Sequence, residues 1–359
     1  MNITFLIGNG FDLNAGLRTR YRQFLEFYCS KECQHTYAAG AAETEIERAV
    51  MLSTISDFTH AMKRDLPYWS DFEDALGRET VNPPLNQKKT FDLCLADFEI
   101  EFNGYLRREL ARFDLKASLP EASLHLRDDL VGHMDKLRPR YRRALLDGFG
   151  PKLHQDRLYQ FISFNYTPVL DQLLGPLHDA PFRDSGSVVH RFGQVIHVHG
   201  RIDDGMIMGV NDESQIENRR LAALPEFHSS IVKPVINQEY GSGADTDAEQ
   251  LIRASDGICC FGTSIGRTDA HWWQMVGEWL LTDKSHQVIL FSRGAGLDIR
   301  LPQFFHHQDN NLKRHFLSQC FPGDDAARKT AAPRVFAALQ TEMFSGVTLR
   351  EKPSSPAKP

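Results

Sequence analysis

The chain has 359 residues, of which 42% are hydrophobic and 25% are charged, and its formal net charge is −6. This composition is typical of a soluble globular protein with one large or two ordinary domains. The acidic balance argues against a protein that mainly grips a polyphosphate backbone, so nucleic acid is not the partner we expect. No run of about 18 apolar residues occurs, so we expect no membrane span.

The N-terminus passes from Met1 directly into a strand-like run, without a basic region or a cleavage site. We therefore expect no secretion signal. The six cysteines are scattered along the chain, and no second pair completes a zinc-binding spacing. Free thiols in a reducing compartment are the ordinary interpretation, which makes the cytoplasm the expected location.

The first predicted element is a strand at residues 3–7, followed by the sequence GNGFD at 8–12. Apolar residues at three- and four-residue spacing then predict long amphipathic helices over 43–66, 90–113 and 123–146. Glycine at positions 8 and 10 fits a phosphate-binding turn and a simple tight bend equally well. The first βα turn is therefore ambiguous by itself.

Later strands are predicted from apolar runs at 158–165, 194–200, 205–210, 257–264 and 286–292. Helical segments separate several of these runs, and such βα alternation favours an α/β protein with a doubly wound, Rossmann-like parallel sheet. Continuous apolar runs are typical of strands that are covered on both faces.

The simplest assembly pairs the lone first strand with these later strands. We then expect the nucleotide-binding domain to comprise residues 1–19 and 151–350. Residues 20–150 form a large helical insertion after the first strand. The segment 351–359 is rich in proline and serine and is expected to be a disordered tail.

Four predicted strands end in small or polar residues, at 8–12, SFNYT (163–167), HVHG (197–200) and GTSIGRTD (262–269). Each motif alone has an ordinary explanation, as a turn, a helix cap or a satisfied histidine. Ligands of open α/β sheets, however, bind outside the carboxyl ends of the strands. The four motifs together therefore predict one shared ligand site.

Five blocks of sequence resemble the AbiH family of bacterial phage-defence (abortive infection) proteins: LIGNGFDLNAGLRTRYRQF (6–24), WSDFEDALG (69–77), SFNYT, HVHG and FGTSIGRTD (261–269). The blocks occur in family order and extend the resemblance over most of the chain. One departure is Arg18, where the family often has proline. The second block lies in the helical insertion. It either closes over the site or packs as an ordinary helix with solvated acids.

More distantly, the order of the motifs is similar to that of sirtuin-like NAD hydrolases of phage defence. This similarity implies a sirtuin-like sheet, NAD as the substrate without a prosthetic group, and Asn165 and His199 as the catalytic pair. The glycine turn would hold the pyrophosphate. The residues expected to contact the nucleotide are Gly8, Asn9, Gly10, Phe11, Asp12, Gly262, Ser264 and Asp269.

The proposed chemistry suits these residue types. Cleavage of the nicotinamide–ribose bond passes through an oxocarbenium-like state. An imidazole with an unperturbed pKa of about 6.5 is a suitable base. The amide of Asn165 both donates and accepts hydrogen bonds, so it is suited to position water or a ribose hydroxyl. Two departures, Asp12 in place of serine and Thr167 in place of aspartate, leave the ribose contacts open.

Two other functions stay open at this stage. His197 and His199 are two apart on an expected strand, so both side chains would face one way. With Asp12 or Asp269 they could hold the metal ion of a metal-dependent nuclease or hydrolase.

The second alternative is a non-catalytic nucleotide sensor. Because a constitutive NAD hydrolase would starve its host, we also expect an activator derived from phage or from a partner protein. A homo-oligomer stays open as well.

Overall fold

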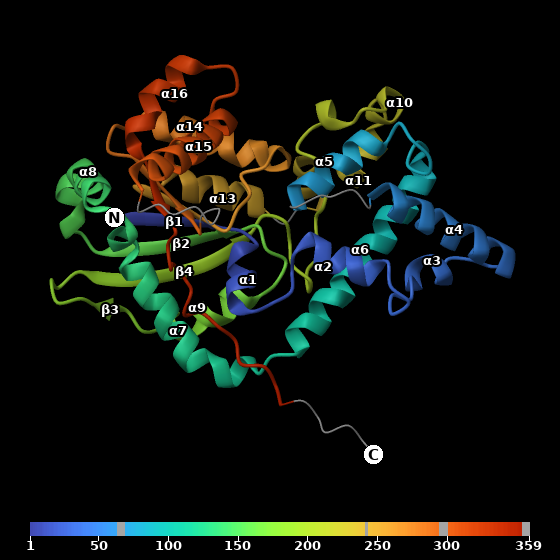
Figure 1. Cartoon of the computed structure of the whole chain (residues 1–359), viewed down its shortest axis with the longest axis horizontal. Helices are drawn as coiled ribbons and strands as arrows, with labels where there is room; N and C mark the ends of the chain where they lie inside the picture. The colour runs from blue at the N-terminus through green and yellow to red at the C-terminus, as the bar shows by residue number, and fades with distance from the viewer. Residues whose placement is uncertain (63–68, 241–242, 294–300, 354–359) are drawn as a thin grey trace.

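The computed structural model describes residues 1–62, 69–240, 243–293 and 301–353. Its centre is a seven-stranded sheet in the order β3-β4-β2-β1-β5-β6-β7 (Figure 1). Short β3 pairs antiparallel with β4, and the remaining neighbours pair in parallel. The strands are β1 (Asn2–Ile7), β2 (Arg157–Ser163), β3 (Phe182–Arg183), β4 (Val189–His197), β5 (Gly257–Phe261), β6 (Gln287–Ser292) and β7 (Val335–Leu339). The predicted α/β class is confirmed.

The strand register brings the carboxyl ends of the central strands to one level. Ile7 of β1 pairs with Ser163 of β2 on one side and with Phe261 of β5 on the other. Ser163 pairs in turn with His197 at the end of β4, and Phe261 pairs with Phe291 of β6. The residues that follow these strands therefore emerge along the same edge of the sheet.

Helices cover both faces of this sheet because alternate strand residues point to opposite sides. Ile3, Phe5 and Ile7 of β1 belong to a core that includes α7 (Leu115–Val131), α8 (Pro139–Phe149) and α9 (Val169–His178). The intervening Leu6 belongs to the core on the other face, with α13 (Ala244–Arg253), α14 (Ala270–Thr282), α15 (Pro302–Cys320) and α16 (Asp325–Ala331). The sheet is thus the middle of three layers.

The connection from β1 to β2 is helical and contributes to two cores. Its last helices, α7 and α8, pack on the sheet. The earlier helices build a second, aromatic core, in which the rings of Phe72 and Phe98 stack at 4.4 Å. We call this part the helical lobe. It contains α2 (Tyr21–Tyr28), α3 (Thr36–Gly40), α4 (Glu45–Met62), α5 (Trp69–Glu79) and α6 (Lys88–Ala111).

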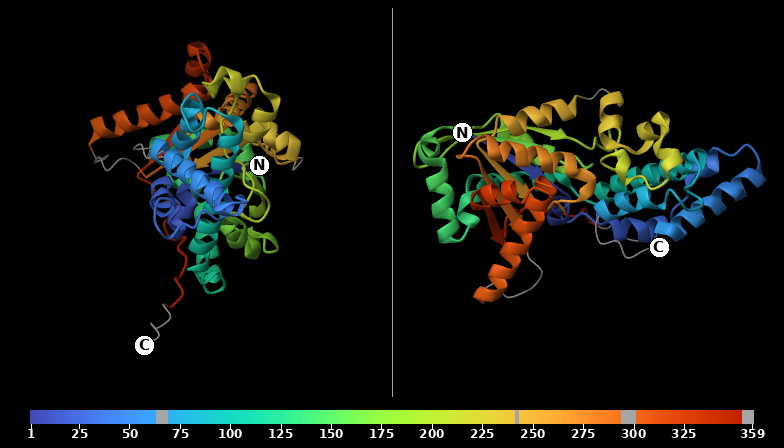
Figure 2. Two further views of the ribbon diagram at one scale, coloured as in Figure 1. Left: turned by 90° about the vertical axis from the view of Figure 1, so that its right-hand side faces the viewer. Right: turned by 90° about the horizontal axis from the view of Figure 1, so that it is seen from above.

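A second segment, between β4 and α13, completes the helical lobe. Its apolar residues, among them Val210, Phe227 and Ile231, are buried in the lobe core. Its helices are α10 (Arg219–Ala222), α11 (Pro225–Ile231) and α12 (Lys233–Tyr240). Figure 2 shows the lobe projecting to one side of the sheet layers. Within the described residues, the helices of both parts are too short or too polar to cross a membrane.

Two predicted elements are wrong for identifiable reasons. The run 205–210 is not a strand, because Gly205 and Gly209 take φ values of 79° and 148° and bend the backbone. The predicted helix 123–146 is two helices, α7 and α8, since Gly132 ends the first and Pro139 begins the second. The predicted helix 43–66 begins at Glu45, and its residues 63–66 lie outside the described residues.

The expected C-terminal tail is only partly within the described residues. Glu351 forms an isolated bridge with Phe113, and the Lys352 amide donates to the Arg112 carbonyl at 2.8 Å. The remaining residues, 354–359, lie outside the described part of the chain. The start of the segment is therefore attached where the chain passes from the helical lobe to the sheet layers.

The glycines of the first turn pack against the turn after β5. A Cβ atom added to Gly10 would lie 2.5 Å from Gly262 Cα, and one added to Gly8 would lie 2.6 Å from the Gly262 carbonyl oxygen. Gly262 itself has φ 71°, which favours glycine. The absence of side chains at Gly8 and Gly10 thus allows the first turn to pack closely against the turn after β5.

We predict that Gly10→Ala lowers the free energy of unfolding by about 1–3 kcal/mol, because the methyl group overpacks the contact with Gly262. Urea denaturation measures this change. Gly104→Ala is the matched control: it lies inside α6 with open space around its Cβ position, so alanine should stabilise by up to about 1 kcal/mol. Equal stabilities of the two variants would contradict the packing role of Gly10.

Candidate functional site

A cavity of about 340 Å³ lies at the carboxyl ends of the central strands and reaches the helical lobe. Its volume is within the range of small-molecule sites. Phe102 and Leu106 of α6 form its lobe side, and Phe164 and Trp273 lie on its sheet side. The predicted site residues that line the cavity are Gly8, Asn9, Gly10, Asp12, Asn165, His199, Gly262, Ser264 and Asp269.

Phe11 is the exception among the predicted contacts. Its side chain is fully buried in the sheet core, where its ring meets that of Phe344 edge-on at 5.3 Å. Its amide is also used within the turn and donates to the Gly8 carbonyl at 3.0 Å. Phe11 therefore helps to anchor the turn and does not face the cavity.

The other amides of the glycine turn are also engaged. The Gly8 amide donates to the Phe261 carbonyl at 2.9 Å, and the Gly10 amide donates to the Gly262 carbonyl at 3.0 Å. Three of the four amides that could bind a pyrophosphate are thus already engaged, two of them with β5 and the turn that follows it and one within the glycine turn itself. The turn is primarily a structural junction.

Asp12 connects the first turn to the motif after β2. One carboxylate oxygen accepts a hydrogen bond from Thr167 Oγ1 at 2.8 Å, and the other accepts one from Asn165 Nδ2 at 3.2 Å. Asp12 is only 2% exposed, and burial raises its pKa to about 7. The second amide atom of Asn165, Oδ1, is buried without a protein partner. The network therefore leaves an unpaired acceptor on a residue that lines the cavity.

His197 contacts the backbone of Asn165 and the side chain of Asp171, whereas His199 contacts Asp269. Its Nδ1 lies 2.8 Å from the Asn165 carbonyl, and its Nε2 lies 2.9 Å from Asp171 of α9. The expectation that both histidines face one way is wrong, because β4 ends at His197 and His199 lies in the following turn. Over residues 1–62, 69–240, 243–293 and 301–353, no group of three His, Cys, Asp or Glu side chains is arranged to hold a metal ion.

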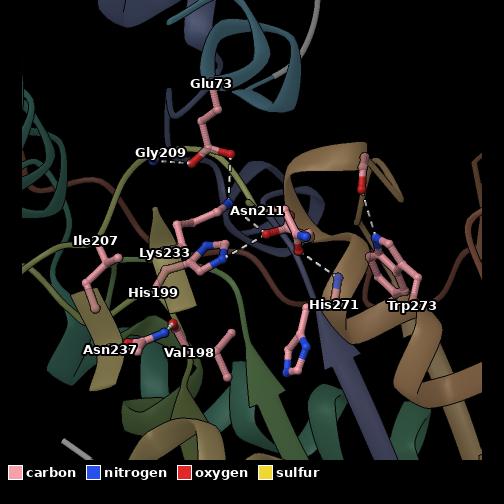
Figure 3. Close-up of polar contacts among 12 residues, drawn as sticks. Glu73, Val198, His199, Ile207, Gly209, Asn211, Lys233, Asn237, His271 and Trp273 are labelled. Carbon is pink, nitrogen blue, oxygen red and sulfur yellow. Dashed lines mark hydrogen bonds and ion pairs between the residues drawn. The ribbon is translucent and has the colours of Figure 1, made fainter. Parts of the chain in front are cut away.

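His199 belongs to a buried chain of ionisable side chains (Figure 3). Its Nε2 lies 3.0 Å from Asp269 Oδ1, at the end of the 3₁₀ turn η4 (Arg267–Asp269). The same oxygen accepts a hydrogen bond from Lys233 Nζ at 2.7 Å, and Lys233 also donates to Glu73 of α5 at 2.9 Å. We call Glu73, Lys233, Asp269 and His199 the ion chain.

Ion pairing explains how these groups tolerate burial. Burial opposes ionisation of Asp269, but the neighbouring Lys233 and His199 outweigh it and hold the pKa of the Asp269 carboxyl well below its usual range. Burial likewise opposes the charge on Lys233, yet Asp269 and Glu73 together raise its pKa. Asp269 is therefore a carboxylate that orients the His199 ring. The other ring nitrogen, Nδ1, has no hydrogen-bond partner among the described residues.

The loop after β5 is held in a strained form beside this chain. Ile265 has φ 53°, which is unusual for a β-branched residue. His315 of α15 lies 3.1 Å from its carbonyl oxygen, and the Trp273 indole donates to the Gly266 carbonyl at 3.1 Å. Such strain persists only where the surroundings fix it, and it concentrates at functional sites.

Comparison with known families agrees with the motifs that form this cavity. The family model described as "Bacteriophage abortive infection AbiH" matches residues 4–291, which include every lining motif named above. The chain belongs to the AbiH family. No curated protein matches the sequence. The family match covers the strand-end turns, α5 and Lys233 alike, so the ion chain lies wholly inside the AbiH region.

Two of the AbiH site residues were not predicted from sequence for definite reasons. Lys233 stands alone between apolar neighbours, and nothing in its sequence indicates that it meets Asp269 across the fold. Glu73 lay in a recognised block, but its burial was not evident. Its Oε1 accepts a hydrogen bond from the Gly209 amide at 3.3 Å. The roles of Lys233 and Glu73 become evident only from the packing of the helical lobe against the sheet edge.

We predict that Lys233→Met destabilises the protein by about 3–5 kcal/mol, because Glu73 and Asp269 would remain buried without their cation. Arg253→Met is the control, since Arg253 pairs with Glu249 at the surface and such pairs contribute about 0–1 kcal/mol. Urea denaturation of both variants makes the comparison. A loss below 1 kcal/mol for Lys233→Met would mean that the ion chain does not stabilise the fold.

A second prediction concerns pH and Asp12. The folded protein holds the Asp12 proton with a pKa of about 7, above the ordinary 3.8, so between these values it binds more protons than the unfolded chain. Stability of the wild type should therefore fall, relative to Asp12→Asn, as pH rises from about 4 to about 7, by up to about 4 kcal/mol. Unfolding free energies at pH 4.5, 6 and 8 test this. A pH-independent difference would contradict it.

Proposed function

We propose that this AbiH protein is an anti-phage effector that hydrolyses NAD to ADP-ribose and nicotinamide in the strand-end cavity. The observation that carries the proposal is that Asn165 and His199 line the same cavity, although they follow different strands. His199 is oriented by Asp269, as a general base requires. Asn165 offers an acceptor without a protein partner.

The sheet supports a nucleotide ligand. Numbered among themselves, the six parallel strands lie in the order 3-2-1-4-5-6, which is the order of Rossmann-type sheets. Such sheets bind their ligands at the topological switch point, where the strand order reverses. Here that point lies between β1 and β5. We accordingly propose a doubly wound, Rossmann-like fold related to that of sirtuin-like NAD hydrolases.

The reaction can be written with these groups. The bond between ribose C1′ and the nicotinamide nitrogen breaks, and its electron pair neutralises the pyridinium ring. A water oxygen forms the new bond to C1′, and His199 Nδ1 takes the water proton while Asp269 stabilises the resulting imidazolium. The Asn165 Oδ1 atom accepts a hydrogen bond from a ribose hydroxyl or from the water. No acid is needed for the leaving group.

A non-catalytic nucleotide sensor is the second candidate, because the same cavity could bind a nucleotide without turnover. The metal-dependent nuclease finds less support, since His197 and His199 bond to different carboxylates. In either role we expect an activator to control the protein, because uncontrolled loss of NAD would harm the host cell.

We predict that His199→Ala and Asn165→Ala each reduce NAD hydrolysis at least about 100-fold, the usual contribution of a positioned base. His307→Ala is the control, because His307 lies on an exposed part of α15 and should leave the rate unchanged. Mass spectrometry of NAD, incubated with protein and phage lysate, measures the products. Intact NAD with degraded nucleic acid, or activity that returns only with a divalent metal, would refute the proposal. Tight NAD binding without turnover would favour the sensor.

A further inference from the structure

The glycine turn leaves a nucleotide's phosphates without their expected donors. The Gly8, Gly10 and Phe11 amides all donate to carbonyls of the protein. An anionic group in the cavity therefore needs donors from elsewhere. Among the described residues that line the cavity, the side chains with a permanent positive charge are those of Arg20 and Arg293.

The acidic residues of the cavity do not cancel these two charges. Asp269 and Glu73 both pair with the ammonium group of Lys233 and not with either arginine. Asp12 is buried and hydrogen-bonded to Thr167 and Asn165. By contrast, neither arginine forms an ion pair with any carboxylate of the described residues, and both are exposed. The cavity thus presents two unneutralised guanidinium groups beside acids that already have partners.

Both arginines follow backbone segments that are fixed beside the cavity. Thr19 donates to Asn9 Oδ1 at 2.5 Å, and Asn9 Nδ2 donates back to the Thr19 carbonyl at 2.9 Å. These reciprocal bonds fix the residue before Arg20 to the glycine turn. Arg293 directly follows β6, whose end is aligned with that of β5. The two arginines therefore line the cavity from the start of α2 and from the sheet edge.

We propose that Arg20 and Arg293 are the phosphate-binding residues of this cavity and that its ligand is a nucleotide with at least two phosphates. A planar guanidinium matches phosphate oxygens with paired hydrogen bonds, which makes arginine suited to this task. Asn9 is then a positioning residue for Arg20. This inference deepens the proposed function, since it assigns the pyrophosphate half of NAD, but it concerns binding and not the hydrolytic step.

The test is equilibrium binding of ADP by calorimetry to wild type, Arg20→Gln, Arg293→Gln and the double variant. Each single change should weaken binding at least tenfold, and the double variant should lose the salt dependence of the wild type. Arg22→Gln is the matched control, because Arg22 lies two residues after Arg20 in α2, pairs with Glu26 and does not line the cavity. Adenosine, which has no phosphate, should bind equally to all variants.

The outcomes separate this inference from the proposed reaction. No ADP binding to wild type, or equal binding to the double variant, overturns the arginine assignment. If NAD is hydrolysed with the same KM by the double variant, the arginine assignment fails while the reaction stands. If ADP binding depends on the arginines but NAD stays intact, the reaction fails while the phosphate site stands. Unchanged thermal midpoints of the exposed variants would exclude loss of folding as the cause.

Discussion

The buried ammonium group of Lys233 makes the ion pairs that link the helical lobe, the sheet layers and the candidate site. It joins Glu73 of the helical lobe to Asp269 of the sheet edge, and Asp269 in turn holds His199. Removing an ion from water costs several kcal/mol unless its partners are in place. The lobe, the start of α12 and the loop after β5 are therefore coupled through Lys233 to the residue that orients His199.

This arrangement divides the charges of the cavity into two groups with different tasks. Within the ion chain, both acids pair with Lys233, and Asp269 also fixes the ring of His199. Arg20 and Arg293 have no carboxylate partner among the described residues and remain available to an anion. Asp12 is the intermediate case, since burial raises its pKa to about 7 while Thr167 and Asn165 hold both its oxygens. A cavity with paired acids and two arginines that have no carboxylate partner among the described residues suits a ligand with a polar reactive end and phosphates.

Much of the fold was predictable because buried parallel strands have a strong local signal. The strands β1, β5 and β6 appear in the sequence as short apolar runs, and their βα alternation predicts the class. β7 was not predicted, since the five residues Val335–Leu339 cannot be told from a buried helix segment by their pattern alone. The run 205–210 was predicted as a strand, but glycines at positive φ bend it. Local apolar pattern therefore predicts central strands better than it predicts strand ends or short edges.

The sequence by itself determined which polar motifs follow the strands, and parallel pairing was enough to bring them to one edge. It placed Asn165, His199 and Asp269 in one candidate site and gave the family through its five blocks. Only the tertiary structure decided what each side chain does there. It showed that Gly8 and Gly10 contact Gly262, that His197 turns away from His199, and that Lys233 enters from a segment without any motif. Those outcomes depend on packing between residues far apart in the chain, and local sequence carries no record of such contacts.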